Sequence, residues 1–473
     1  MNEFELLEKD LMNNITDWYE FDPNIHYIIL KDLNRENQEQ LKQVAKNLKE
    51  NERLLLTFDN RLSMKHFCQI EKNNENLFIR KEIENILREC GLNYQKFYYP
   101  LPDAHMTNVI FTDSHLPDME TLSRNLVFYS NENMKIYEQN NEWEELLKQD
   151  KELFKVFANS FLIECSKFEF VANETQFVSY SNMRKPEYRI QTKIVGDKVY
   201  KKAAQENANQ HIEEIKHYID LLHQIGLDTL DSYESNRIIS QYQKDKPTLD
   251  KYILMLLEQN RKEEANRIID HLMQILKEKL VILSDNSSNV FDKYHIEYHQ
   301  EDIQKMTFVK YGLWDLIFSN IFYIENKYYF YDQEWLEEKL PLEYIIYRSF
   351  HYNAKLKDLM KDRYDINSKE VDLFMQLDDK LQEKIRNPIS WKMHAETMSI
   401  SYQLQKSQKD IEQITQDCQN LLLEKDSRIK FLEDNMEQTC HLLKEKEEEL
   451  NGIKNSISWK ITKPLRGARK FLK

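Results

Sequence analysis

Short apolar runs alternate with amphipathic stretches along the first hundred residues. The apolar runs have the length and composition of buried parallel strands, and the amphipathic stretches have helical spacing. The expected strands and helices, in chain order, are 27–30, 36–49, 54–58 and 80–90. The last helix should stop at Gly91, because glycine commonly ends helices. A strand–helix–strand–helix order predicts an α/β unit, which we assign to residues 1–150 after a lead-in helix over 1–24.

The pattern changes to strict alternation between residues 168 and 202, which predicts an antiparallel meander. A helix over 203–223 should follow, with one apolar face formed by Ala208, Ile212, Ile215, Ile219 and Leu222. The remaining expected elements are a strand at 237–242, helices at 248–258 and 261–284, strands at 321–324 and 328–331, and helices after Pro341. A small sheet followed by a helical lobe is the order of a two-lobed, protein-kinase-like α+β domain, which we assign to 151–385.

Beyond residue 400 the chain becomes highly charged and keeps apolar residues at alternating spacings of three and four. The expected seam comprises Ile411, Ile414, Cys418 and Leu421 and, after a one-residue slip, Leu422, Ile429, Leu432, Met436, Leu443, Leu450 and Ile453. Polar seam positions at Lys425, Thr439 and Lys446 leave the choice between dimer and trimer open. The pattern predicts a helical linker and homo-oligomeric coiled coil over 386–455.

The last residues, 456–473, form a basic segment with interleaved apolar side chains. The stretch WKITKPLRGARKFLK has six basic residues and no acidic one. Such a segment suits an anionic membrane surface, at about 1 kcal/mol per basic residue. It also resembles the tails of bacterial glycosyltransferases, although a solvated, frayed terminus remains the alternative.

Composition narrows the classes of function. The 473 residues suit two globular units plus an extended segment, in agreement with the low mean hydropathy of −0.73. A net charge of −15 argues against nucleic acid as a partner. Five cysteines without a CxxC pair indicate reduced thiols, and we expect neither a signal peptide nor a membrane-spanning segment. We therefore expect a cytoplasmic protein held peripherally on the inner face of the cell membrane.

The strongest chemical signal lies between residues 315 and 335. Asp315 and Asn320 form a D-x-x-x-x-N loop, and a predicted hairpin returns Asp332 to the same place. Phosphoryl transfer needs a carboxylate near the acceptor hydroxyl and oxygen ligands for the nucleotide-bound metal. We therefore assign Asp315 as the catalytic base, with Asn320 and Asp332 as Mg²⁺ ligands.

The matching upstream part is a strand lysine. Lys201 shares strand parity with Val199 and should point inward to the phosphates of ATP, whereas Lys202 should point outward. We assign Glu213, on the following helix, to nucleotide binding together with Lys201 and Arg184. A plain structural reading is the alternative, in which the acidic residues only end turns and Lys201 is a solvated strand lysine.

Two usual kinase features are absent from the sequence. The chain has only six glycines, and none lies between Ser179 and Pro186, where a glycine-rich loop would clamp the phosphates. Arg184 or Lys185 would take over that role. Leu313 and Trp314 stand where a His-Arg pair would precede the catalytic Asp315.

Residues 41–112 resemble the back half of a class I methyltransferase of surface-polysaccharide gene clusters. The resembling segments are 41–48, 52–61, 77–91 and 97–103. Such enzymes bind S-adenosylmethionine on a glycine-rich turn after their first strand, yet no glycine precedes Gly91 here. We therefore expect a truncated domain that does not bind S-adenosylmethionine.

The order of these parts resembles the bifunctional kinase–methyltransferase family that caps polymannose O-antigen chains. The motifs that carry the resemblance are Ala158–Phe161, Lys201 with Ala208 and His211–Ile212, Asp315 with Asn320, and Asp332–Trp335. The resemblance implies a kinase that phosphorylates the end of a growing glycan, a coiled coil that measures length, and a tail that recruits glycosyltransferases of the same pathway. The alternative is a catalytically silent coiled-coil scaffold that organises those glycosyltransferases at the membrane.

Overall fold

The computed structural model describes residues 15–19, 21–67, 75–105, 107–118, 121–122, 136–171, 173–351, 353–364 and 366–462. The chain forms two compact units, Met1–Thr397 and Met398–Lys473, which are described separately below. The expected lead-in helix lies largely outside the described residues, apart from α1 (Ile15–Trp18). Most of the basic tail, from residue 463 onward, also lies outside them.

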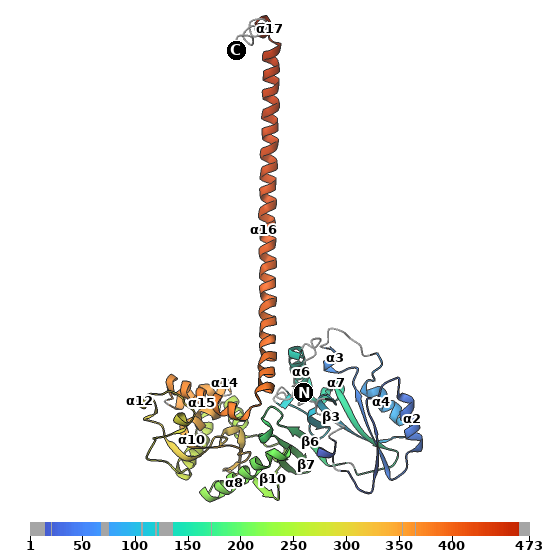
Figure 1. Cartoon of the computed structure of the whole chain (residues 1–473), viewed down its shortest axis with the longest axis vertical. Coiled ribbons are helices and arrows are strands. Elements are labelled where there is room, and N and C mark those ends of the chain that lie inside the picture. Colours follow the sequence, from blue (N-terminus) through green and yellow to red (C-terminus); the bar gives the residue numbers. More distant parts are fainter. Residues whose placement is uncertain are drawn as a thin grey trace. The chain divides into compact units, whose positions relative to one another are not determined.

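Ten strands of the described part of the first unit form one continuous, mostly antiparallel sheet (Figure 1). In spatial order they are β1 (His26–Leu30), β2 (Glu52–Asp59), β5 (Ser160–Ser166), β3 (Tyr94–Pro102), β4 (Thr107–Thr112), β6 (Thr175–Tyr180), β7 (Ile190–Val195), β8 (Lys198–Ala203), β10 (Arg237–Gln241) and β9 (Asp231–Glu234). The predicted strands at 27–30 and 54–58 are confirmed and pair in parallel. Every other pairing in the sheet is antiparallel.

The sheet passes without a break from the methyltransferase-like region into the meander. Val109 and Ile110 of β4 pair with Ser179 and Val178 of β6. The strand β5, which follows residue 150, inserts between β2 and β3, and every residue of β5 is buried. The predicted boundary after residue 150 therefore does not coincide with an edge of the sheet.

Helices cover both regions of this sheet. Those of the first region are α2 (Gln38–Asn47), α3 (Met64–Phe67), α4 (Arg80–Glu89), α6 (Ile136–Gln149) and α7 (Phe154–Phe157). Over the meander, α8 (Asn209–Ile225) buries Ile212, Ile215 and Ile219 against Ile190 and Ile238 of the sheet. The predicted apolar face of α8 is confirmed, although the helix begins later than residue 203 because β8 continues to Ala203.

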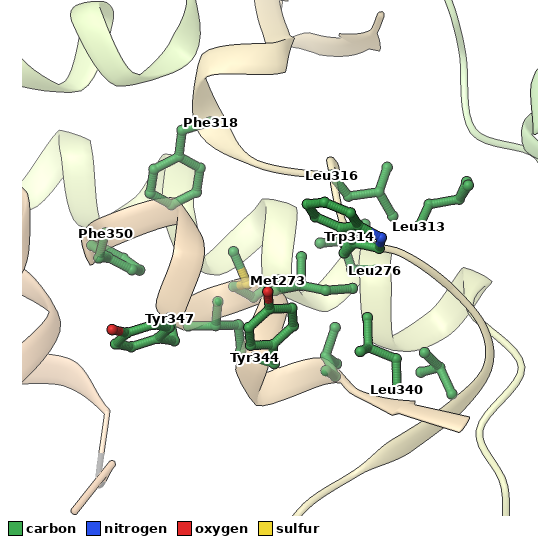
Figure 2. Packing of buried hydrophobic residues seen from close by; sticks show 14 of the residues in the cluster. Met273, Leu276, Leu313, Trp314, Leu316, Phe318, Leu340, Tyr344, Tyr347 and Phe350 are labelled. Atoms are coloured by element: carbon green, nitrogen blue, oxygen red, sulfur yellow. The ribbon is translucent and has the colours of Figure 1, made fainter. Parts of the chain in front are cut away.

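The helical part of the first unit surrounds two short antiparallel ribbons. Its helices are α9 (Leu249–Glu258), α10 (Lys262–Lys279), α11 (Val290–Lys293), α12 (Gln300–Ile303), α13 (Leu342–His351), α14 (Ala354–Arg363) and α15 (Ser368–Ile385). The ribbons pair β11 (Phe308–Leu313) with β14 (Leu336–Pro341), and β12 (Ile321–Ile324) with β13 (Lys327–Phe330). Figure 2 shows part of this core, in which Trp314 lies beside Leu276. Phe318 packs edge-on against Phe350, with ring centroids 4.9 Å apart. This packing fixes the loop that leaves β11.

The long C-terminal helix α16 runs from Pro388 to Asn455, and the short helix α17 (Ile457–Ile461) follows it. At ~1.5 Å per residue, 68 residues of helix span about 100 Å. Leu422, Leu432, Leu443 and Leu450 on α16 are each more than half exposed. The predicted helix is confirmed, and its apolar seam faces solvent in the single chain. Among the described residues, no helix is both long and apolar enough to cross a bilayer.

Candidate functional site: a charged cluster around Lys201

The first component of the site is Lys201 on β8. Its ammonium forms ion pairs with Asp332 and with Glu334, whose Oε1 lies 3.0 Å from Nζ. The side chain of Lys201 is only 15% exposed, whereas Lys202 is exposed. The predicted orientations of the two lysines are therefore confirmed, and the strand lysine contacts acidic residues more than a hundred positions later in the chain.

A tight hairpin delivers Asp332 to this lysine. Strands β12 and β13 are joined by Glu325 and Asn326, whose φ angles of 50° and 63° give the left-handed pair that two-residue hairpin turns need. Asp332 itself has a φ of 58°, and its backbone N–H donates to Asp231 Oδ2 at 2.8 Å. The backbone of Asp332 is thus fixed by β9, while its carboxylate faces Lys201.

The Asp315 loop is tied to the same segment. Buried side chains anchor it on either side of Asp315: Trp314, Leu316 and Phe318. The side-chain amides of Asn320 and Gln333 both donate to the backbone oxygen of Asp315, at 3.2 and 2.8 Å. The backbone N–H of Tyr331 donates to the oxygen of Asn320 at 3.1 Å. Asp315, Asn320 and Asp332 therefore belong to one hydrogen-bonded neighbourhood.

Asp315 has a cationic partner from the helical part. Arg348 on α13 lies 3.2 Å from Asp315 Oδ1 and donates to the backbone oxygen of Trp314 at 2.6 Å. Its Nε lies 3.1 Å from Asp378 Oδ1. Burial raises the pKa of Asp315 above its ordinary value, although the charge of Arg348 opposes that rise. The carboxylate is therefore a better proton acceptor than a solvated aspartate, while Arg348 holds its orientation.

Glu334 joins the two predicted phosphate-binding cations. Its Oε2 lies 2.5 Å from Arg184 Nη1, so the same carboxylate bridges Arg184 and Lys201. The Glu334 side chain is 6% exposed. Burial alone would raise the pKa of Glu334, but the charges of Arg184 and Lys201 hold it well below its ordinary value. Glu334 therefore stays ionised and keeps both cations in place.

Stacked rings support this bridge from the side of Trp335. The guanidinium of Arg184 lies 5.4 Å from the Trp335 ring centroid. The buried ring of His211 on α8 stacks on the Trp335 ring, with ring centroids 4.4 Å apart. The Trp314 ring also stacks on Trp335, with ring centroids 6.0 Å apart. The rings thus connect the Arg184 side of the site to the loop that carries Asp315.

Of the six residues that the sequence assigned to the site, the structure brings five together and leaves Glu213 outside. Glu213 on α8 has a 63% exposed side chain and pairs with Lys216 Nζ at 2.5 Å. The buried carboxylate beside Lys201 is that of Glu334, whose role sequence reasoning missed. The only signal for Glu334 was its position two residues after Asp332, and the left-handed backbone of Asp332 makes that spacing a weak guide.

The donor set fits a magnesium–nucleotide complex better than a bare metal ion. Among the described residues, no group of three or more His, Cys, Asp or Glu side chains is placed to hold a metal ion. Mg²⁺ that arrives with a nucleotide needs only one or two protein carboxylates, because phosphates and water complete its shell. Asp332 and Asn320 offer one carboxylate and one amide oxygen of this kind.

Comparisons with known proteins leave the family of this chain open. No family model matches it, and no curated protein matches it. Among solved structures, a crystal structure of WbdD aligns with 80% of this chain and 74% of its own at 9% identity, with a TM-score of 0.21. A likeness at that TM-score carries no argument about fold or function.

Proposed function

We propose that this chain is an ATP-dependent, kinase-like phosphotransferase of bacterial surface-polysaccharide assembly. The observation that carries the proposal is the convergence of Lys201 with Asp332 and Glu334. A strand lysine, a D-x-x-x-x-N loop and an aspartate returned by a hairpin are the parts that position a nucleotide for phosphoryl transfer. The packing of the core supports the loop, and the sheet supports the lysine.

Each side chain has a distinct role in this proposal. Lys201 and Arg184 bind the phosphates, and Glu334 orients both cations. Asp332 and Asn320 hold Mg²⁺, which neutralises charge on the phosphates when it is bound. Asp315 accepts the proton of the acceptor hydroxyl, in keeping with its raised pKa.

The acceptor in this proposal is the end of a surface glycan, and phosphorylation there controls chain termination or length. This choice rests on the family resemblance of the sequence motifs. The resemblance also supports glycosyltransferases of the same pathway as partners and the cytoplasmic face of an anionic membrane as the location. The cofactors of this proposal are ATP and Mg²⁺, without S-adenosylmethionine.

Nucleotide binding tests the proposal directly. Titration calorimetry of the full chain with ATP should give Mg²⁺-dependent binding, and radiolabelled ATP should transfer phosphate to a polymannose acceptor. Lys201→Met should abolish both, whereas Lys202→Met should leave both within about twofold because Lys202 points to solvent. Absence of ATP binding by the wild-type chain at millimolar nucleotide would refute the phosphotransferase proposal.

A second candidate function, a catalytically silent scaffold, is favoured by the exposed seam of α16. Leu432 and Leu443 are 53% and 58% exposed, and association would remove them from water at roughly 25 cal/mol per Å². Sedimentation should show a dimer or trimer, and Leu432→Asp combined with Leu443→Asp should weaken this association.

Membrane binding by the basic tail is tested separately. Anionic liposomes should bind the full chain and release it at high salt, whereas a chain ending at Gly452 should stay oligomeric and not bind the liposomes.

A further inference from the structure

The connection that leads into α16 is hydrogen-bonded to the loop between β6 and β7. Lys185 of that loop donates its backbone N–H to the oxygen of Ile385 at 2.8 Å. In the opposite direction, Asn387 donates its backbone N–H to the oxygen of Met183 at 2.9 Å. The connection itself is only two residues long, since α15 ends at Ile385 and α16 begins at Pro388. A short connection held by reciprocal bonds cannot move without moving the loop.

Arg184 lies between the two hydrogen-bonded positions of the loop. It forms an isolated antiparallel bridge with Arg386, so the backbone of Arg184 is held in an extended conformation. The ammonium of Lys185 donates to the oxygen of Lys384 at 2.8 Å, and Arg189 Nε donates to the oxygen of Arg184 at 3.0 Å. The backbone of Arg184 is therefore restrained from the α15–α16 connection and from its own loop.

The guanidinium of Arg184 points to the other side, into the charged cluster. It pairs with Glu334 and lies over the Trp335 ring. In a loop that has no glycine, backbone N–H groups cannot approach phosphates closely, so a side-chain cation must serve instead. The position of that cation depends on the backbone that the connection restrains.

We propose that Lys185 and Asn387 are positioning residues that hold Arg184 for contact with the phosphates of a nucleotide, and that they couple this contact to the start of α16. The inference rests on the proposed function and adds its regulation. Coupling between two sites is reciprocal in free energy. Phosphate binding at Arg184 therefore stabilises the hydrogen bonds of the connection, and loss of those bonds weakens phosphate binding.

Proline substitution at residue 185 removes one of these hydrogen bonds selectively. Lys185 has a φ of −57° and precedes Pro186, so proline fits its backbone and deletes only the N–H that reaches Ile385. Lys185→Ala is the matched control, because both variants lose the ammonium and only the proline variant loses the backbone donor. Asn387→Pro and Asn387→Ala form a second pair, which tests the bond to Met183 from the other side.

The readout compares ligands with and without phosphates in the full chain. Misplacement of one charged contact should weaken ATP binding with Mg²⁺ by about tenfold in Lys185→Pro relative to Lys185→Ala. Adenosine binding, followed by ligand-observed NMR, should differ by less than twofold between the two variants. In the wild type, hydrogen exchange at the amides of Lys185 and Asn387 should slow on addition of ATP and stay unchanged with adenosine.

The possible results separate this inference from the function on which it rests. Equal ATP affinity in both members of each pair would overturn the positioning role while leaving the phosphotransferase intact. Equal losses for ATP and adenosine, together with a lower melting temperature, would also overturn it, because they indicate a general packing defect. If the wild-type chain binds no ATP, the proposed function and this inference fail together.

Discussion

Among the charged clusters in the described part of the first unit, the one around Lys65 and the one around Lys201 differ in their access to solvent. In the first cluster, Lys65 pairs with Asp59 at 2.7 Å and with Asp103 at 3.1 Å, and Ser160 donates to Asp59 at 2.6 Å. The side chains of Lys65 and Asp103 are each 6% exposed, whereas that of Asp59 is 25% exposed, so the buried pair of this cluster is Lys65 with Asp103. In the cluster around Lys201, by contrast, the side chain of Asp332 is 35% exposed and that of Arg184 is 26% exposed.

The difference separates a structural ion pair from a candidate site. Burial opposes the charge of Lys65, but the charges of Asp59 and Asp103 keep its pKa above the ordinary value, so it is a permanent cation and a poor nucleophile. It ties the end of β2 to the residue after β3. The cluster around Lys201 has the same kinds of groups, yet its open carboxylate and guanidinium can meet a ligand.

Lys65→Met should give the largest effect, and it should fall on stability alone. The substitution keeps most of the side-chain volume but leaves the buried carboxylate of Asp103 without its cation, and breaking a buried pair in this way costs about 3–5 kcal/mol. Urea unfolding of the full chain should show an earlier transition, while the affinity for ATP in the remaining folded protein stays within twofold. An unchanged unfolding midpoint would contradict the assignment of this cluster as structural.

Asp332→Asn should give the next largest effect, and it should fall on binding. The change removes a metal-binding carboxylate and one of the two partners of Lys201, so Mg²⁺-dependent ATP affinity should drop at least about a hundredfold, or ~2.7 kcal/mol. The matched control is Asp103→Asn, the same chemical change at the buried partner of Lys65. Calorimetry should find ATP affinity retained in that control, and equal losses in both variants would erase the distinction between the clusters.

The local elements that carry the candidate site could be predicted from the sequence more fully than the order of strands in the sheet. The strand lysine, the D-x-x-x-x-N loop and the hairpin are local patterns, and their elements form as expected because turn residues and apolar spacing determine them. The strands β1 and β2 were also predicted, and the structure shows that they pair in parallel. The insertion of β5 between β2 and β3 was not predicted, because contacts between residues far apart in the sequence decide which strands pair, and such contacts leave no local signal.

The carboxylate that pairs with Lys201 could not be predicted from local sequence patterns either. Helical periodicity placed Glu213 on α8 but could not say which face would point to the lysine. The buried face of α8 is the isoleucine row of Ile212, Ile215 and Ile219 that packs on the sheet, so Glu213 points to solvent. Asp332 adopts a left-handed conformation, so side chains do not alternate regularly from Asp332 to Glu334. Strand alternation therefore could not predict that Glu334 reaches Lys201.

Glu334→Gln should have a moderate effect on stability that depends on pH. At pH 7 the variant loses the ion pair with Arg184 and the charge-assisted hydrogen bond from Lys201, which should cost about 2 kcal/mol. Because the folded-state pKa of Glu334 is lowered, its contribution is complete above the unfolded glutamate pKa of about 4.3 and declines as the pH falls toward the folded value.

Unfolding midpoints of the wild type and of Glu334→Gln should therefore differ most at pH 6–7 and converge below about pH 4.3. Glu297→Gln, at an exposed position outside the helices and strands, is a suitable reference for the general effect of acid on the chain. A difference that stays constant or grows on acidification would mean that Glu334 is not held ionised by the two cations.

Glu213→Gln should have the smallest effect on stability and on ATP affinity. That result would show that Glu213 is not the carboxylate that orients Lys201. The Glu213 side chain is 63% exposed and pairs with Lys216, whose side chain is 12% exposed, and helix pairs at this spacing contribute about 0.2–0.5 kcal/mol. Stability should therefore change by less than about 0.5 kcal/mol, and ATP affinity by less than twofold. Glu334→Gln, measured in the same calorimetric titration, should weaken ATP binding because Lys201 and Arg184 lose their shared partner. If Glu213→Gln weakened ATP binding as strongly as Glu334→Gln, the nucleotide-bound protein would have to bring α8 to Lys201, and the helix glutamate of the original sequence assignment would be restored.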